Sequence, residues 1–260
     1  MRSIAAICLL ALVVAPAPAR ADDLAHKYAH FARADEATVS EVRGFTVAGV
    51  RGTTHLVFGR NPTSGPWLAR RVVLMNCDAR QCHGEAVGLA ASDTLAVVGV
   101  VDLAGDPTEV PTDDRGARAI PGEYARLPRL GTGPRRMRWP ALVVADATAT
   151  PATVEGPYGT DRGTDRRHDL WFISLRASDR GAVLFREPTM RVGPGGRGVT
   201  ASYRLVREAK RGPLTIVATE TRHAGRHTGC LPPPPTEHRF TWQQHRFERV
   251  ADLAGATGCH

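Results

Sequence analysis

The closest-spaced cysteines of the chain form the segment with the clearest chemical potential. Cys77 and Cys82 are separated by four residues, and His83 follows the second cysteine directly. Two thiols can form a disulfide, bind a soft metal ion or attach to a cofactor, and imidazole is a common metal ligand. The spacing alone permits all three uses, so the surrounding sequence has to decide between them.

The run Cys77–His83 resembles the attachment site of c-type haem in its longer form, in which four residues separate the two thiols. The resemblance covers seven residues, and it implies thioether bonds from both thiols with His83 as the proximal iron ligand. The flanking runs Val72–Met75 and Glu85–Leu89 favour extended strands, whereas a haem histidine usually opens into a helix. A disulfide at the tip of a hairpin therefore explains the segment better, with haem c as the alternative.

A second segment, His223–Cys230, begins with a histidine, carries another at His227 and ends in a cysteine. These three side chains could be ligands of a zinc ion, with His238 or Cys259 as a fourth. The glycines within the segment favour a flexible loop, and a disulfide at Cys230 would remove the thiolate. We therefore expect loop histidines here, and zinc is the alternative.

Enzyme signatures are weak throughout the chain. Asp102 and Asp106 faintly resemble the calcium loops of FG-GAP-like repeats, in which alternate acidic residues converge on one cation. Ala104 and Pro107 occupy positions where that pattern needs an acidic residue and a glycine, so an ordinary turn is expected. The sequence contains no Gly-x-Ser-x-Gly elbow, no His-Glu-x-x-His and no phosphate-binding glycine loop. These patterns favour a binding or structural module over an enzyme.

Aromatic side chains on the strand-like runs are candidates for lining a ligand groove. Trp171, Tyr203 and Trp242 are the clearest of them. Because side chains alternate between the two faces of a strand, burial in a core is the more favourable interpretation.

The first residues have the pattern of an export signal. Arg2 is positive, Ile4–Val14 is an apolar run, and Ala19–Ala21 is a small-x-small cleavage site. The apolar run is too short to span a bilayer. We expect cleavage after Ala21 and an exported protein, periplasmic or secreted, whose mature part has no transmembrane segment.

Four cysteines remain after this cleavage, and an even number in an oxidising compartment predicts disulfides. Four cysteines allow three pairings. We predict the pairing between sequence neighbours, Cys77 with Cys82 and Cys230 with Cys259. In the chain-entropy model, loops of about six and about thirty residues contribute about 2 and about 3.5 kcal/mol respectively.

The charge balance is basic but dispersed. Removing Arg2 and Arg20 with the leader lowers the formal net charge from +8 to +6. Nearly all of the positive charge is arginine, and it is interleaved with aspartate and glutamate rather than gathered in a block with aromatics. We therefore expect no nucleic-acid partner, and the partner is an unknown ligand or protein of the envelope or extracellular space.

Most of the chain consists of short runs rich in β-branched and aromatic residues, separated by glycine and proline turns. One amphipathic helix is expected at Leu24–Ala34, and the absence of interleaved helices excludes a parallel α/β sheet. We predict an all-β fold of predominantly antiparallel meanders, forming a two-sheet sandwich or a propeller-like arrangement, with one short N-terminal helix. The expected strands are residues 38–42, 45–47, 55–58, 71–75, 85–89, 95–103, 139–145, 169–175, 199–206, 214–219, 239–242 and 246–250.

Residues 105–138 are rich in proline and glycine and show little apolar periodicity. Such a long stretch is unusual inside a compact domain, so it suggests where the chain is divided. The expected segments are a signal peptide (1–21), an N-terminal helix (22–37), a first β-rich half (38–104), a linker or long surface loop (105–138) and a second β-rich half (139–260).

Overall fold

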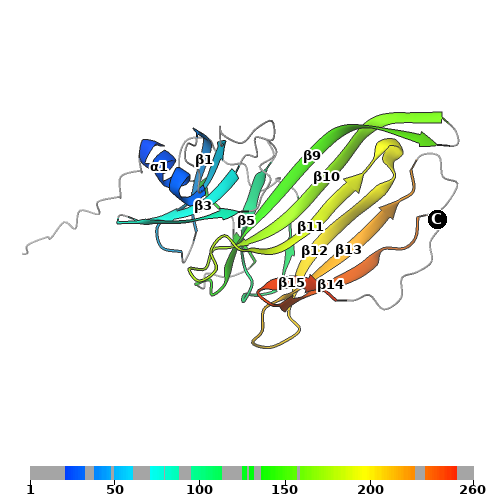
Figure 1. Ribbon diagram of the computed structural model, residues 1–260. Coiled ribbons are helices and arrows are strands. Elements are labelled where there is room, and N and C mark those ends of the chain that lie inside the picture. Colours follow the sequence, from blue (N-terminus) through cyan, green and yellow to red (C-terminus); the bar gives the residue numbers. More distant parts are fainter. Residues whose placement is uncertain are drawn as a thin grey trace, which may run out of the picture.

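The computed structural model describes residues 21–32, 38–47, 50–60, 71–78, 80–87, 95–112, 125–127, 129–131, 136–156, 159–225 and 232–250. Within these ranges the chain forms the helix α1 (Ala21–Ala32), the 3₁₀ turn η1 (Pro194–Gly196) and fifteen strands in two sheets (Figure 1). The predicted all-β sandwich with one short helix is confirmed. The strands belong to two sheets and not to a ring of blades, so the propeller-like alternative does not apply.

The smaller sheet has five strands in the order β4-β3-β2-β1-β7. β1 to β4 form an antiparallel meander, and β7 joins the other edge of β1 in parallel. The bounds are β1 Thr38–Thr46, β2 Thr53–Arg60, β3 Arg71–Cys77, β4 Cys82–Val87 and β7 Ala125–Arg126.

The larger sheet has ten strands in the order β15-β14-β13-β12-β11-β10-β9-β5-β8, with β6 paired to β12. Its pairs are antiparallel except for β5 with β8. The bounds are β5 Ala96–Asp102, β6 Thr108–Val110, β8 Arg129–Leu130, β9 Pro140–Gly156, β10 Gly159–Ser174, β11 Val183–Val192, β12 Gly198–Val206, β13 Thr215–His223, β14 Thr236–Gln243 and β15 Arg246–Arg249.

The larger sheet folds back on itself at the junction of β11 and β12. β11 pairs with β10 along its length, but it meets β12 only where Met190–Val192 lie opposite Gly198–Thr200. Beyond that corner, β6 takes the place beside β12. The ring of Phe185 on β11 lies 5.1 Å from that of Phe240 on β14, whereas three strand spacings in a flat sheet would be about 14 Å. We call β5 and β8–β11 the middle layer, and β6 and β12–β15 the outer layer.

The central strands β9 and β10 are buried on both faces over Ala141–Val144 and Leu170–Ile173, which explains the unbroken apolar runs there. On β9, Leu142 and Val144 pack in a first core between the smaller sheet and the middle layer. Ala141 and Val143 pack in a second core between the middle and outer layers. β10 alternates in the same way from Leu170 to Ile173, so these two strands join both cores into one structure.

The helix α1 covers the outer face of the smaller sheet (Figure 1). Tyr28 is only 1% exposed and packs with Val57, Val73 and Met75, and Phe31 lies against the same cluster. The predicted apolar stripe of the helix therefore faces the sheet. Within the described residues, no helix combines the length and the apolar character that crossing a membrane requires.

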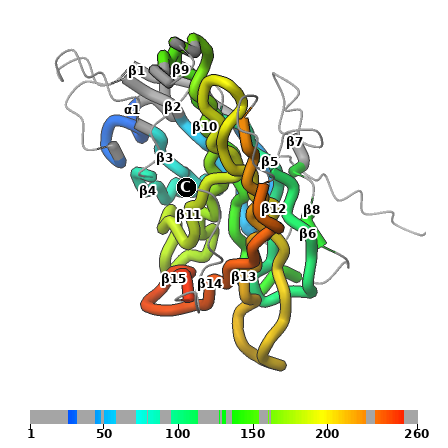
Figure 2. Tube along the Cα trace, turned by 90° about the vertical axis from the view of Figure 1, so that its right-hand side faces the viewer, coloured from blue at the N-terminus to red at the C-terminus, as the bar shows by residue number. Residues whose placement is uncertain are grey.

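The hairpin of β9 and β10 is longer than the predicted strands 139–145 and 169–175, and β11 forms where no strand is predicted. Pro151 and Gly163 indicate turns by type, yet both lie inside the ladder. β9 pairs with β5 only over Pro140–Ala145, so its distal part is an edge among the described strands, where proline is tolerated. Figures 1 and 2 show this ribbon reaching the end of the molecule opposite the β12–β13 loop.

The predicted leader, residues 1–21, lies outside the described residues except for Ala21. The described parts of 105–138 contain the three short strands β6, β7 and β8, each paired to a longer strand. β5, which belongs to the predicted first half, pairs with β9 of the second half.

Candidate functional site: an arginine-lined groove beside the disulfide hairpin

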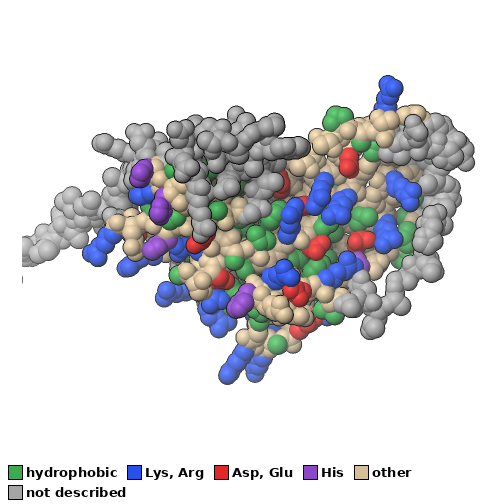
Figure 3. Space-filling view, in the orientation of Figure 1, with side chains coloured by type: hydrophobic (Ala, Val, Ile, Leu, Met, Phe, Trp, Pro, Cys, Tyr) green, Lys and Arg blue, Asp and Glu red, His purple; other side chains and the backbone are tan. Residues whose placement is uncertain are grey.

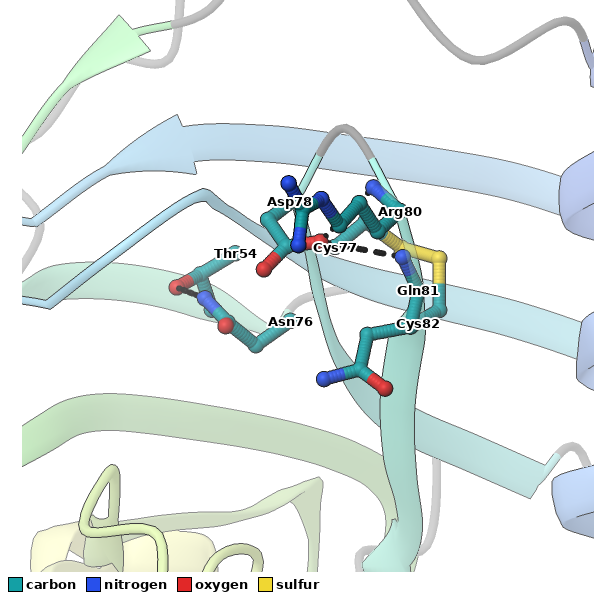
Figure 4. Close-up of a disulfide and its surroundings, with 7 residues drawn as sticks. All are labelled: Thr54, Asn76, Cys77, Asp78, Arg80, Gln81 and Cys82. Atoms are coloured by element: carbon teal, nitrogen blue, oxygen red, sulfur yellow. Dashed lines mark hydrogen bonds between the residues drawn. A yellow bond between two sulfur atoms is a disulfide. The ribbon is translucent and has the colours of Figure 1, made fainter.

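The tip of the β3–β4 hairpin is cross-linked and tightly turned. Cys77 and Cys82 lie opposite each other in the ladder and form a disulfide, as the sequence predicts. The Asp78 carboxylate accepts hydrogen bonds from the backbone amides of Arg80 and Gln81, at 2.8 and 2.9 Å (Figure 4). Those two amides hold the pKa of Asp78 below its usual range, so the turn keeps a charged cap at neutral pH.

The turn before β2 lies directly against this hairpin. Gly52 has a φ of +83°, and a Cβ atom there would lie 2.3 Å from the carbonyl oxygen of Cys77. Only glycine permits both the backbone conformation and the close approach. The neighbouring Arg51 is therefore held near Asp78, where its positive charge also lowers the pKa of that carboxyl.

A buried carboxylate fixes the segment that precedes β9. Asp102 is 8% exposed and accepts hydrogen bonds from the backbone amides of Ala104 (3.1 Å), Arg138 (3.1 Å) and Trp139 (2.8 Å). The Arg138 guanidinium donates to the carbonyl of Ala104 at 2.9 Å. Asp102 thus binds backbone amides, and Asp106 is exposed, so the structure does not bring the two together as calcium ligands.

The turn that follows β10 supplies the third side of the site. The amide of Leu175 donates to the carbonyl of Pro140 at 3.0 Å, which ties this turn to the start of β9. The Arg176 guanidinium lies 4.9 Å from the centroid of the Trp139 ring and 3.7 Å from the Asp179 carboxylate. A cation over an aromatic face is a favourable arrangement that orients the side chain.

These elements enclose a groove of about 620 Å³. Its floor contains apolar side chains of the first core, including Met137 and Leu175. Among the described residues, its rim carries one acidic residue, Asp78, and five arginines: Arg51, Arg136, Arg138, Arg176 and Arg180. We call this feature the arginine groove. Figure 3 shows Lys and Arg side chains spread over this face of the molecule, several of them at its lower left, below β3.

The arginine groove is short of negative charge. In the described part of the chain, neither Arg51 nor Arg136 forms an ion pair. Burial lowers the pKa of Arg180, and the charge of Glu85 opposes that shift. A desolvated guanidinium gains from an anionic partner, and like charges around a concave surface focus the potential. The geometry is therefore suited to binding an anion.

His83, the histidine of the haem-like motif, is not among the residues that line the arginine groove. His83 is exposed and lines an adjoining groove of about 650 Å³ with Phe31, Glu85 and the turn at 177–182, which shares Arg180 with the arginine groove. The sulfurs of Cys77 and Cys82 are bonded to each other, so neither is a thiol that could form a thioether.

The predicted zinc ligands are only partly described. His223 is exposed, and its Nε2 lies 2.8 Å from the Thr200 hydroxyl. His238 is buried on β14, with Nε2 3.6 Å from the Glu220 carboxylate. His227, Cys230 and Cys259 lie outside the described residues, and so does the predicted second disulfide. Among the described residues, no group of three or more His, Cys, Asp or Glu side chains is placed to hold a metal ion.

The candidate groove aromatics are divided between the two cores. Trp171 lies in the first core, with the Arg186 guanidinium 4.1 Å from its ring centroid. Tyr203 lies in the second core, where its hydroxyl donates to the carbonyl of Pro188 at 2.7 Å, and Trp242 packs against that core. The structure therefore places Trp171 on the opposite face of the middle layer from the other two.

The arginine groove is the feature that sequence reasoning missed. Its arginines come from three separate segments between strands, and along the chain they appear as scattered single charges. The positions of these arginines could have indicated the groove. Each of them lies just before or just after a strand, and several of those strand ends meet in space.

Comparison with models of known protein families, with curated proteins and with solved structures finds no match to this chain.

Proposed function

We propose that this chain is an exported binding module that captures acidic glycans of the cell envelope or its surroundings in the arginine groove, without chemical turnover. One observation carries the proposal: five guanidinium groups and one carboxylate surround a groove with an apolar floor. The export-signal pattern of residues 1–21 and the Cys77–Cys82 disulfide support an oxidising compartment.

Arginine is the side chain best matched to such a ligand. Its planar fork donates paired hydrogen bonds to carboxylate, sulfate and phosphate groups. The five arginines belong to three different segments of the chain, which fits a ligand that carries several anionic groups along its length. The apolar floor offers contact for the faces of sugar rings.

The groove supplies charge rather than proton transfer. In the part of the chain that the structure describes, Asp78 is the one carboxylate on its rim, and one oxygen of Asp78 already accepts two backbone hydrogen bonds of the hairpin turn. A guanidinium group donates hydrogen bonds but does not exchange its proton in proteins. These groups suit binding better than general acid–base catalysis, which needs a group that titrates near the working pH.

Isothermal titration calorimetry with two anionic probes tests the proposal. A heparin tetrasaccharide presents sulfates, oligogalacturonate presents carboxylates only, and neutral dextran is the uncharged control. We expect both anionic probes to bind and dextran not to bind. Affinity should fall as salt is raised, because the screening length shrinks from about 10 Å at 0.1 M to about 3 Å at 1 M.

A pair of double variants separates the groove from general basicity. Arg51→Gln with Arg136→Gln removes two unpaired rim charges, and binding should weaken by about tenfold or more, since charged hydrogen bonds contribute about 1.5–3 kcal/mol each. The matched control, Arg162→Gln with Arg166→Gln, removes the same charge from exposed positions on the distal part of β10. Equal losses in both double variants would show that diffuse charge, not the groove, binds the probes.

Export is tested separately by N-terminal sequencing of the protein recovered from the periplasm or medium of its own host. We expect the mature chain to begin at Asp22. Recovery of the uncleaved chain from the cytoplasm would contradict the export part of the proposal without bearing on the groove.

A further inference from the structure

A second cavity lies at the corner where β11 passes into β12, between the middle and outer layers. Its volume is about 120 Å³, and five strands, β11 to β15, contribute to its lining. None of the residues that line it belongs to the arginine groove. The cavity is therefore an independent site.

The floor of the cavity is an extension of the second core. Tyr203, Ala218 and Phe240 are buried there, and Ala201 packs against them. An apolar floor offers contact to the carbon atoms of a ligand but no hydrogen bonds. Specificity therefore has to come from the rim.

The first charged group of the rim that could contact a ligand is the Glu187 carboxylate. Glu187, on β11, is half-buried, and in the described structure no hydrogen bond or ion pair engages its carboxylate. Burial raises the pKa of Glu187, although the charges of Arg249 and Arg191 oppose that shift. A partly desolvated carboxylate without a direct partner is stabilised by a cationic group that hydrogen-bonds to it.

The second such group is the Arg191 guanidinium. Arg191 lies four residues further along β11, is exposed, and forms no ion pair within the described residues. The neighbouring charged groups are engaged: Nη2 of Arg249 lies 2.5 Å from Nδ1 of His238, and Glu220 lies 3.3 Å from Arg222. Glu187 and Arg191 are therefore the charged groups of the rim that have no hydrogen bond or ion pair within the described structure.

We infer that this cavity binds a small zwitterion of about the size of glycine, with its ammonium group against Glu187 and its carboxylate against Arg191. The size follows from the volume, because a cavity of about 150 Å³ holds benzene with its six heavy atoms, and glycine has about five. The charge pattern follows from the two unpaired groups, which project from the same strand over one apolar floor.

Nuclear magnetic resonance titration of the mature chain tests the inference with three probes at equal ionic strength. Glycine carries both charges, acetate carries only the negative one, and methylammonium carries only the positive one. We expect glycine to shift the backbone amides of Ala201 and Ala218 in a saturable way, with an affinity about tenfold or more above either analogue, because each analogue loses one charged hydrogen bond.

Two variants assign the contacts. Glu187→Gln should lower glycine affinity to about that of acetate, and Arg191→Gln should lower it to about that of methylammonium. Glu237→Gln is the matched control, because Glu237 is exposed on β14, faces away from the cavity and pairs with Arg204 at 2.7 Å. This control should leave all three affinities unchanged.

Several results overturn the inference. Equal shifts from all three probes would show that charge pairing does not select the ligand, and absence of shifts around the cavity would show that it binds none of them. Glycine affinity that survives both rim substitutions would have the same meaning. Arg191 is exposed, so its substitution leaves the fold intact and keeps the inference testable if Glu187→Gln fails to fold.

Discussion

At the scale of single residues, Asp102 is the side chain that most directly holds the arginine groove in shape. Its carboxylate accepts three backbone amide hydrogen bonds, two of them from the residues that lead into β9. Because these amides lie close to the surface of a packed core, they lose their partner if the carboxylate is removed.

We predict that Asp102→Ala lowers the free energy of unfolding by about 2–4 kcal/mol, since an unsatisfied buried group costs about 1–3 kcal/mol. Asp102→Asn should cost less, because the amide oxygen still accepts. Urea denaturation followed by circular dichroism measures both. Equal stability of Asp102→Ala and the wild type would show that these hydrogen bonds do not hold the segment.

A second residue, Asp169, forms a charged cluster at the edge of the first core. It is 5% exposed, and Arg167 contacts both of its oxygens at 3.0 Å while Arg186 donates to one at 3.2 Å. Burial acts to raise the pKa of Asp169, but the hydrogen bonds and charges of the two arginines outweigh it, so the pKa lies below the usual 3.8.

A lowered pKa in the folded state means that ionised Asp169 stabilises the fold above about pH 4, and that this contribution is lost as the pH falls from there through the folded-state pKa. We predict that Asp169→Asn lowers the free energy of unfolding by about 1–3 kcal/mol at pH 7, a modest value because both arginines are half-exposed. The difference from the wild type should shrink below about pH 4. Urea titrations at pH 7 and pH 3 measure it.

The control for this prediction is Asp179→Asn, because Asp179 is more exposed and has a single arginine 3.7 Å away. We expect little change from this substitution at either pH. A constant difference between Asp169→Asn and the wild type across the pH range would mean that packing, not charge, accounts for the role of Asp169.

At the scale of elements, the disulfide hairpin contributes both to the stability of the fold and to the shape of the arginine groove. It holds Asp78, and the turn containing Arg51 lies against it. We predict that Cys77→Ala with Cys82→Ala lowers the free energy of unfolding by about 2 kcal/mol, the value expected for a loop of about six residues. Oligogalacturonate affinity should fall as well, because part of the rim loses its fixed position. Unchanged affinity in a destabilised variant would separate the hairpin from the site.

The elements were predictable where alternation or burial is strong. The run Ala141–Val144 is apolar at every position and is a central strand, and Cys77 and Cys82 meet as their spacing predicts. β11 was not predictable in this way, because Pro188 and its charged residues hide the period of a strand.

The β14–β15 hairpin shows a similar limit of local patterns. The expected strands 239–242 and 246–250 leave three residues for the turn, yet the loop has only two, Gln244 and His245, with φ of +43° and +71°. Neither is the asparagine or glycine that usually marks such a turn. Tertiary packing of Trp242 and Phe247 across the hairpin overrides that preference.

At the scale of the whole molecule, β9 and β10 make the layers interdependent, because each strand contributes to both cores. We predict a single unfolding transition in urea, with coincident midpoints by tryptophan fluorescence and far-ultraviolet circular dichroism. Leu74→Ala in the first core and Phe172→Ala in the second should each shift the whole curve, by about 2–5 kcal/mol. Two transitions, with Leu74→Ala moving only one, would show that the two halves of the chain fold independently.

The candidate site was not predictable from single residues or from single elements. Arg51 and Arg180 are 129 positions apart in the chain, and no local pattern links them. They share a groove only because the smaller sheet packs on the middle layer and brings the ends of β3, β9 and β10 together.

The most direct test of the account is a crystal structure of the mature chain with oligogalacturonate bound. We predict that the ligand lies in the arginine groove, with its carboxylate oxygens within hydrogen-bonding distance of at least two of Arg51, Arg136 and Arg138. Ligand bound on another face of the molecule, or an empty groove in crystals grown at a concentration that saturates the protein in solution, would contradict the assignment of this groove as the binding site.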